Sequence, residues 1–175
     1  WNKYFILGSS QANDFLIDGD KIIIVGTTNT TLSQAYPYVA SFDIKTGALI
    51  HSTIYKPADI SGCSINAVFK SGKNYICSIN MPGAAVTDGK YFFLRLDTSL
   101  NIISAKRLKP TIQSAVRDLS YFFSSDTDGS FWGIGGQGQT SILQNILFRI
   151  NNLDSVSWTS LLNLGLIQPT DLSHN

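Results

Sequence analysis

Few residues in this chain have the types and spacing that catalysis needs. The sequence holds two histidines, His51 and His174. A catalytic triad or a metal cluster sets its histidine beside a nucleophile or beside further ligands. His51 falls in an expected strand and His174 among the last residues, and no such grouping is readable around either. We predict no catalytic residues, no metal and no cofactor.

Two aspartates, Asp126 and Asp128, give a weak hint of a calcium site. They belong to a stretch, Ser124 to Gly129, in which oxygen-bearing side chains precede a glycine. Calcium takes about six to eight oxygen ligands, several of them carboxylates. Two carboxylates are few, so we favour a plain hairpin turn over a calcium loop.

The glycine-rich run Gly133 to Gly138 reads GIGGQG. A phosphate-binding loop of this kind needs a strand before it and a helix after it. Here another strand-like segment follows. We therefore expect a turn or a wide loop, with no nucleotide site.

The two cysteines, Cys63 and Cys77, are too few for a disulfide framework or a zinc site. With a hairpin turn near Gly72, Cys77 would lie opposite Ala67, four residues from Cys63. We favour two buried free thiols. A Cys63–Cys77 disulfide stays open as the alternative, and it would need the loop at Gly62 to curl back.

Asn29 begins the sequence Asn29-Thr30-Thr31, which is an N-glycosylation acceptor motif. We expect it in the loop after a strand over Lys21–Thr27, where it would be exposed. It is the glycosylation candidate if the protein is secreted.

Composition limits the classes of protein. Charged residues make up 14% of the chain, against a usual share of about 25%. The polar residues are mostly Ser, Thr, Asn, Gln and Gly, which favours an extracellular or cell-surface β protein. The net charge of +1 with no basic run argues against a nucleic-acid partner. No apolar stretch approaches the roughly 18 residues of a membrane span.

The chain has an internal period of about 53 residues. Asp14, Asn66, Asp118 and Asp171 are spaced by 52, 52 and 53 residues, and Asp43, Asp97 and Asn151 by 54 and 54. The sequences WNKYFILG, from Trp1, and WTSLLNLG, from Trp158, lie 157 residues apart. We expect the recurring Asp and Asn side chains to bind nearby backbone amides at strand starts.

Each period holds four short segments rich in β-branched and aromatic residues, separated by turn sequences such as Asp18-Gly19-Asp20. No helical periodicity competes. This pattern predicts an all-β chain, a β-propeller built of four-stranded antiparallel blades. The whole chain, 1–175, would be one propeller segment, with complete repeats at about 14–55, 64–108 and 118–162 and partial blades at 1–8 and 169–175. We expect Trp132 and Trp158 to pack between blades, and long loops at Thr28–Pro37, Lys56–Cys63, Met81–Gly89 and Gly136–Asn145.

These residues resemble the SBBP-type β-propeller repeat, whose pattern runs from an aromatic-led strand ending in Gly to a strand closing on Ser-Thr. The matching stretches are WNKYFILG, Asp14, Asp18-Gly19-Asp20, Ile22–Thr28, Val39–Gly47 and His51–Tyr55. The second period departs from the pattern, with Ile79 where the first has Gly26. The resemblance covers nearly the whole chain as repeat architecture. It implies a surface, secreted or adhesion-associated protein whose motif residues are structural.

Three complete blades do not close a ring of about four to eight. We therefore expect a fragment of a longer propeller, or a ring completed by other copies. The predicted function is a non-catalytic structural or interaction module, an extracellular scaffold or adhesion-type propeller with protein partners and also carbohydrate. Two alternatives stay open: a filament or surface-assembly subunit joined by strand exchange of half-blades, and a propeller enzyme whose site lies on missing sequence.

Overall fold

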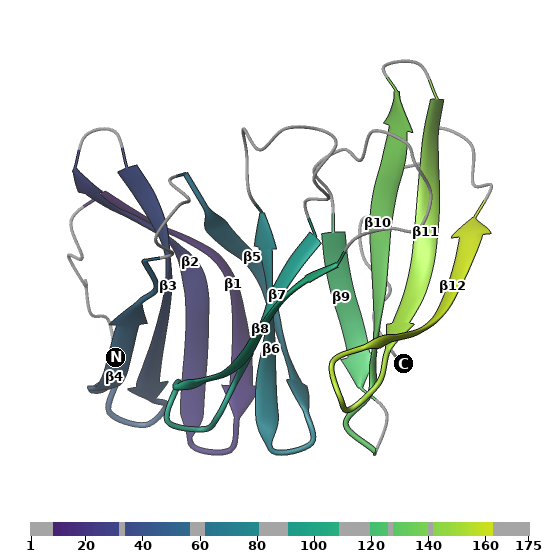
Figure 1. Ribbon diagram of the computed structural model, residues 1–175. Helices are drawn as coiled ribbons and strands as arrows, with labels where there is room; N and C mark the ends of the chain where they lie inside the picture. The colour runs from purple at the N-terminus through teal and green to yellow at the C-terminus, as the bar shows by residue number, and fades with distance from the viewer. Residues whose placement is uncertain are drawn as a thin grey trace.

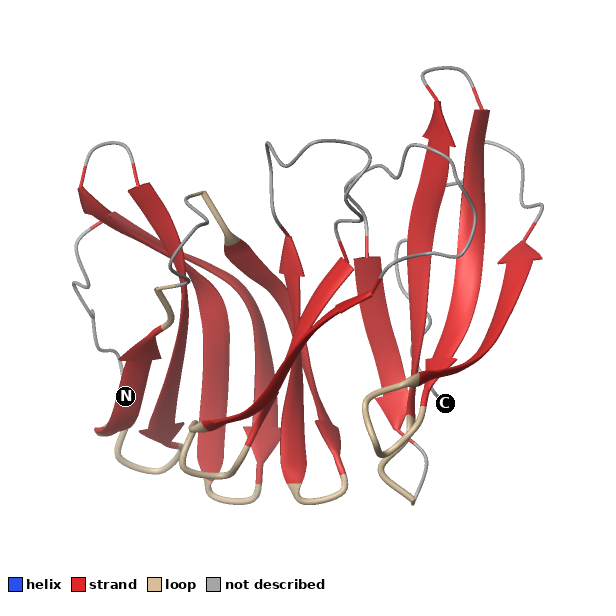
Figure 2. Cartoon of the chain, in the orientation of Figure 1, coloured by secondary structure: helices blue, strands red, loops and turns tan. Residues whose placement is uncertain are grey.

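The computed structural model describes residues 9–31, 34–56, 62–80, 91–108, 120–125, 128–139 and 142–162. These residues form twelve strands and no helix, as Figure 1 and Figure 2 show. The strands are β1 Ser9–Asp18, β2 Lys21–Thr31, β3 Gln34–Asp43, β4 Leu49–Ile54, β5 Ser64–Ser71, β6 Asn74–Asn80, β7 Tyr91–Leu96, β8 Ile102–Leu108, β9 Ser120–Ser125, β10 Phe131–Gln139, β11 Ile142–Ile150 and β12 Val156–Leu162. Each of the four segments expected in the three complete repeats overlaps one of them.

The strands make three separate four-stranded sheets, each an antiparallel meander in chain order. The first sheet is β1 to β4, the second β5 to β8 and the third β9 to β12. The expectation of an all-β chain with four-stranded antiparallel sheets is confirmed. The three sheets stand side by side in an open series (Figure 1).

Tight hairpins open the first two sheets. Asp18 pairs with Lys21, and Ser71 pairs with Asn74, so two residues form each turn. Gly19 and Gly72 take φ values of +59° and +60° there. Glycine adopts this left-handed backbone without steric cost, which is why the Asp18-Gly19 and Ser71-Gly72 sequences specify the turns.

Successive side chains of a strand point to opposite sides of its sheet, so each sheet has two faces. We call the side that carries Ile22, Tyr75 or Phe131 the first face of its sheet. These three residues occupy equivalent positions, because each pairs with the same site on the third strand of its own sheet. The opposite side, which carries Ile23, Ile76 or Trp132, is the second face.

Adjacent sheets bury a second face against a first face. Ile23, Val25 and Val39 of the first sheet share one apolar core with residues of the second sheet, among them Val68, Tyr75, Cys77, Leu94 and Leu96. The next boundary repeats the arrangement with Phe69, Ile76 and Phe93 against Phe131, Phe148 and Ile150. Full burial of each such side chain contributes about 1.5–3 kcal/mol. The first strands also adjoin, β1 beside β5 and β5 beside β9.

Two of the expected loops are instead hairpin extensions. β2 runs to Thr31 and β3 begins at Gln34, so most of Thr28–Pro37 is paired strand. Gly136 likewise pairs with Asn145 at the top of the β10–β11 hairpin. Composition alone predicted loops wrongly here, because a threonine-rich or glycine-rich segment still pairs when a long partner strand lies beside it.

Several sequence predictions fall outside the described residues. They are the partial blades 1–8 and 169–175, the markers Asp118 and Asp171, His174, Asp126 and the expected loop at Met81–Gly89.

Candidate functional site

The polar residues with the most specific geometry lie at the boundaries between sheets. At the first boundary the Asp14 carboxylate accepts a hydrogen bond from the backbone N–H of Val68 at 2.8 Å. The adjacent Asn13 side chain donates to the carbonyl of Ile65 at 2.7 Å. These bonds join β1 to β5. The expectation that Asp14 binds a nearby amide is therefore wrong, because its partner belongs to the next sheet.

A β-bulge explains how Asn13 and Asp14 reach the neighbouring sheet. The pairing of β1 with β2 shifts between Ala12 and Asp14, and that of β5 with β6 shifts between Ile65 and Ala67. The extra residues are Asn13 and Asn66, so these two are structurally equivalent. The marker spacing had aligned Asn66 with Asp14, one residue away from the true match.

Asp18 ties the end of the first hairpin to the second sheet. Its carboxylate accepts hydrogen bonds from the Lys70 ammonium and, at 2.7 Å, from the Tyr75 hydroxyl. These two bonds hold the pKa of Asp18 below its ordinary value of 3.8. Burial, together with the bond to Asp18, raises the pKa of Tyr75.

A third contact at the first boundary involves the turn between β7 and β8. The Tyr55 hydroxyl donates to the carbonyl of Leu100 at 2.7 Å, and both residues are buried. Leu100 has a φ of +65°, which is uncommon for a residue other than glycine. The equivalent turn of the first sheet has Gly47 at φ +66°, and that of the third has Asp154 at φ +59°.

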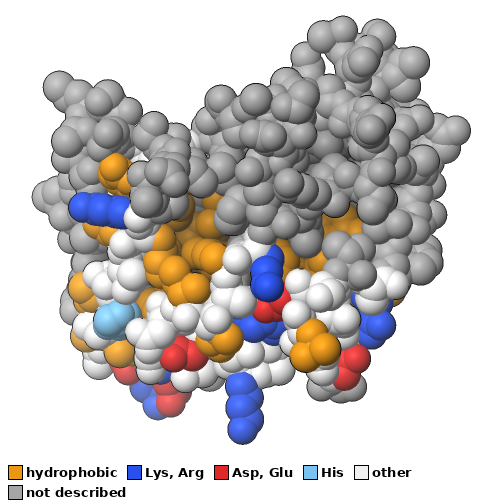
Figure 3. Space-filling view, in the orientation of Figure 1, with side chains coloured by type: hydrophobic (Ala, Val, Ile, Leu, Met, Phe, Trp, Pro, Cys, Tyr) orange, Lys and Arg blue, Asp and Glu red, His pale blue; other side chains and the backbone are white. Residues whose placement is uncertain are grey.

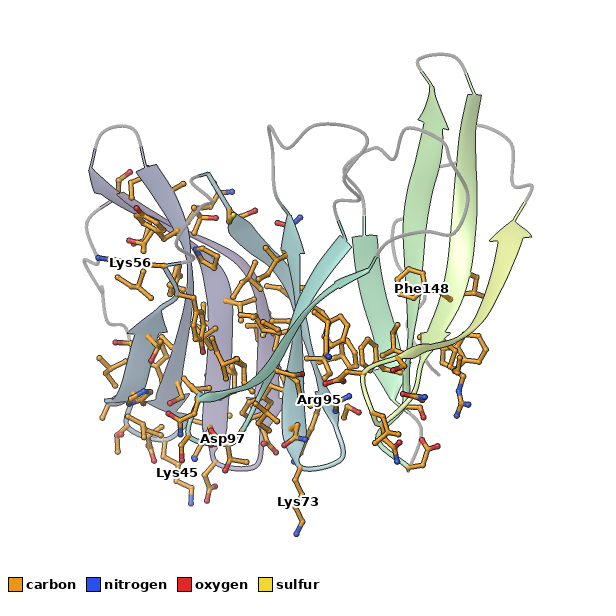
Figure 4. The ribbon with its side chains drawn as sticks, viewed as in Figure 1. Lys45, Lys56, Lys73, Arg95, Asp97 and Phe148 are labelled. Carbon is orange, nitrogen blue, oxygen red and sulfur yellow. The ribbon has the colours of Figure 1, made fainter. Side chains whose placement is uncertain are left out.

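Asp154 forms the centre of the second boundary. The Arg95 guanidinium, from β7, binds its carboxylate through Nη2 at 2.6 Å and Nε at 2.8 Å. Ser104 donates to the other carboxylate oxygen. Arg95 also stacks 5.7 Å from the centre of the Phe131 ring. Figure 4 places Arg95 where the second and third sheets meet.

Sequence reasoning missed this ion pair, although a signal was present. Arg95 interrupts the apolar strand Tyr91–Leu96, and a charge inside a buried strand needs a partner. The periodicity placed Asp154 in a turn and so gave no reason to pair it with a strand of another sheet.

A cleft of about 470 Å³ opens to solvent beside the Arg95–Asp154 pair. Most of its lining comes from the β5–β6, β9–β10 and β11–β12 turns. The lining residues include Ser71, Asn74, Asp128 and Asn152. Figure 3 shows charged side chains gathered along this turn edge of the molecule. The groups offer hydrogen bonds and charge for binding. The described residues that line the cleft include no Ser-His or Cys-His pair for nucleophilic chemistry.

The second set of markers binds local backbone amides as expected, but in the turns that follow the third strands and not at strand starts. Asp43 accepts from the amides of Lys45 and Thr46, Asp97 from those of Ser99 and Asn101, and Asn151 from those of Leu153 and Ser155. Each closes the turn between the third and fourth strands of its sheet. The pKa of Asp43 is lowered first by a hydrogen bond from the Thr46 hydroxyl and that of Asp97 first by one from the Asn101 side-chain amide, and the backbone bonds lower both further.

The residues considered for chemistry are dispersed. His51 is exposed on β4, with its Nε2 3.1 Å from the Thr53 hydroxyl. Asp128 accepts from the amide of Ser130 at 2.9 Å and lies 3.5 Å from Arg149, and the Ser130 bond is the main reason its pKa is lowered. Within the described part of the chain no three His, Cys, Asp or Glu side chains gather as metal ligands.

The two thiols lie in the core at the first boundary. Cys63 and Cys77 are buried and are not joined to each other. Cys77 pairs with Val68 across the hairpin, not with Ala67, because the bulge at Asn66 shifts the register. Burial raises the pKa of the Cys63 thiol to about 11, and burial also raises the pKa of the Cys77 thiol.

Asn29 and the glycine-rich run both lie on strands. Asn29 is exposed on β2, where it pairs with Ser9 and Ala35, so its expected place in a loop is wrong. Gly133 to Gly138 form part of β10, paired with β11. Trp132 is half-buried on β10, and Trp158 lies in β12.

Comparison with known proteins adds no family to these observations. No family model matches the sequence, and no curated protein matches it either. None of the described residues form a helix long and apolar enough to cross a membrane.

Proposed function

We propose that the chain is a series of β-propeller blades that acts as a non-catalytic structural and interaction module of an extracellular or cell-surface protein. Its partners would be other proteins and also carbohydrate, met by the turns and loops at the ends of the sheets.

One observation carries this proposal. At both boundaries the second face of one sheet packs against the first face of the following sheet. The first strands β1, β5 and β9 also lie side by side. Blades of a propeller are related in this way, because each repeats the same step about a common axis. The resemblance of the repeat to SBBP-type sequences and the low content of charged residues support the same view.

The use of the polar side chains also supports a structural role. Asp14, Asp18, Arg95 and Asp154 have specific partners, and each of those partners belongs to another sheet or turn. A catalytic group is normally held with a binding face turned toward a substrate. Here the same groups fasten one sheet to the next.

Distances between spin labels would test the blade arrangement. In a propeller the last strands of neighbouring blades are farther apart than the first strands, because the blades fan out from the axis. Ile17 and Lys70 are equivalent exposed or partly exposed sites on β1 and β5, and Ile50 and Ile103 are equivalent exposed sites on β4 and β8. We expect the Ile50–Ile103 distance to exceed the Ile17–Lys70 distance. Equal distances would mean parallel stacked sheets and would contradict the proposal.

A further inference from the structure

Three Asp-Gly sequences occur in the chain, and two of them, Asp18-Gly19 and Asp128-Gly129, lie among the described residues. The third, Asp88-Gly89, lies outside them. An aspartate before glycine can cyclise onto the backbone, because glycine has no side chain to shield its amide nitrogen and leaves the main chain free to rotate. The two described carboxylates are held in opposite ways, so this chemistry should differ between them.

The Asp18 carboxylate is turned away from its own turn. One oxygen accepts a hydrogen bond from the Lys70 ammonium and the other accepts one from the Tyr75 hydroxyl, and both donors belong to the second sheet. The Asp18 side chain is 17% exposed. Its backbone ends β1, paired with Lys21. Cyclisation at Asp18 would therefore have to break both side-chain hydrogen bonds.

The Asp128 carboxylate instead folds over its own turn. Its Oδ1 accepts a hydrogen bond from the backbone N–H of Ser130 at 2.9 Å, so the carboxyl group reaches across the peptide between Asp128 and Gly129. The Asp128 side chain is 55% exposed, and its contact with Arg149 is a long one of 3.5 Å. Asp128 lies in the connection between β9 and β10, outside both strands. Its carboxyl carbon is thus directed toward the Gly129 amide nitrogen.

We propose that Asp128-Gly129 is a site of spontaneous isomerisation to isoaspartate. The Gly129 amide nitrogen bonds to the carboxyl carbon of Asp128, and the amide proton and the carboxyl hydroxyl leave together as water, which gives a cyclic succinimide. Water then opens the ring, and it has access through the solvent-open cleft that Asp128 and Gly129 help to line. Attack on the former side-chain carbonyl restores aspartate. Attack on the former main-chain carbonyl breaks its bond to the Gly129 nitrogen and leaves isoaspartate.

The modification would act on the boundary between the second and third sheets. The Gly129 carbonyl accepts hydrogen bonds from the Ser71 hydroxyl at 3.0 Å and from Arg95 Nη2 at 3.4 Å. Isoaspartate adds a methylene group to the main chain directly before Gly129, so this carbonyl would move away from both donors. Isomerisation at Asp128 should therefore loosen the attachment of the third sheet to the second.

Prolonged incubation of the folded chain at physiological temperature, followed by tryptic digestion, tests the site. Isoaspartate is quantified with protein isoaspartyl methyltransferase and located by electron-transfer fragmentation. Trypsin leaves Asp18, Asp88 and Asp128 on different peptides. Because Asp18 must first break two hydrogen bonds, we expect isoaspartate to accumulate about tenfold faster at Asp128 than at Asp18. In water enriched in oxygen-18, each passage through the succinimide should add a heavy oxygen to the Asp128 peptide.

Tyr75→Phe is the matched variant, since it removes one protecting hydrogen bond from Asp18 and leaves the Asp128 turn unchanged. Isoaspartate at Asp18 should then form about three- to tenfold faster, with no change at Asp128. In concentrated urea the two sites should react at similar rates. Equal rates at Asp18 and Asp128 in the folded chain would overturn the proposal. A rate at Asp128 that is about tenfold or more lower in the folded chain than in urea would overturn it as well.

Urea unfolding before and after incubation tests the effect on the boundary. Asp128→Ser is the control, because serine has no carboxyl carbon to attack yet keeps a side-chain oxygen for the Ser130 amide. The unfolding midpoint of the wild type should fall as isoaspartate accumulates, whereas that of Asp128→Ser should stay constant. A wild-type midpoint that does not change despite isoaspartate at Asp128 would contradict the loosening of the boundary.

Discussion

The side chains of Arg95 and Asp154 meet at 2.6 Å across the boundary of the second and third sheets, where they are 6% and 9% exposed. A buried ion pair is stable only when hydrogen bonds compensate for lost hydration. Ser104, the Gly129 carbonyl and the Phe131 ring supply that compensation here. The ion pair therefore holds the β11–β12 turn of the third sheet against β7.

Removal of one member of this pair should be costly. We expect Arg95→Met or Asp154→Asn to lower the free energy of unfolding by about 3–5 kcal/mol, because the remaining group stays buried without its partner. The double variant Arg95→Met/Asp154→Leu should lose much less, since leucine already occupies the equivalent turn position at Leu100. Urea unfolding checks both, and single variants that lose under about 1 kcal/mol would argue that the pair is hydrated in solution.

Gly26 should tolerate no side chain. A Cβ at this position would lie 2.0 Å from the backbone carbonyl oxygen of Gln11 on the neighbouring strand. Gly26→Ala should therefore destabilise the chain by about 3 kcal/mol in thermal or urea unfolding. Gly72→Ala is the control for backbone strain alone, because its Cβ would meet nothing within 4 Å. Gly72→Ala should lower the free energy of unfolding by about 1–2 kcal/mol. Equal losses of stability in Gly26→Ala and Gly72→Ala would contradict the steric clash at Gly26.

Stability should fall in acid as Asp18 takes up a proton. Its pKa is lowered in the folded state, first by the Lys70 bond and then by the Tyr75 bond, from an ordinary value of 3.8. The stabilising contribution is thus complete above that value and is lost as the pH falls through the folded-state pKa. The exposed Asp43, Asp97 and Asp128 follow the same direction.

Unfolding measured between pH 2 and pH 6 checks this prediction, with the range chosen to bracket the carboxyl pKa values of about 4. Asp18→Asn should lower stability at neutral pH and make the acid decline shallower. Tyr75→Phe removes one of the two hydrogen bonds, so the decline should begin at a higher pH. An unchanged profile in Asp18→Asn would show that the contact with Lys70 and Tyr75 is not formed in solution.

Neither cysteine should react while the chain is folded. The thiolate is the reactive form, and burial keeps both thiols protonated near pH 8. A disulfide-exchange reagent should therefore label no thiol in the native state and both after unfolding without reductant. His51→Cys, on an exposed strand position, should react at once and serves as the positive control. No labelling after unfolding would mean that Cys63 and Cys77 form a disulfide.

Local features of the fold were predictable because they are encoded within a few residues. The sequences at Gly19 and Gly72 specify tight hairpins, and Asp43, Asp97 and Asn151 close the later turns through their own neighbours. Period and turn chemistry together therefore located the strands and their order.

Contacts between sheets were not predictable in the same way. The partner of Asp14 lies 54 residues along the chain and is reached only because Asn13 forms a bulge. The pairing of Arg95 with Asp154 likewise depends on which faces pack together, which periodicity does not specify. The error of one residue at Asn66 has the same origin, since a spacing does not reveal where a bulge inserts.

The left-handed position in the turn between the third and fourth strands is filled differently in every sheet: by Gly47, by Leu100 and by Asp154. Two of these residues contact a neighbouring sheet. Leu100 packs in the core beside Tyr55, and Asp154 forms an ion pair with Arg95. The repeats are therefore not interchangeable, although they share one outline. A chain with its second and third repeats exchanged would keep every hairpin yet set Asp154 opposite Ser41, which is the counterpart of Arg95 in the first sheet. The residue at this one turn position therefore distinguishes the repeats from one another. A difference in sequence at this position would favour the native order of the sheets over other orders.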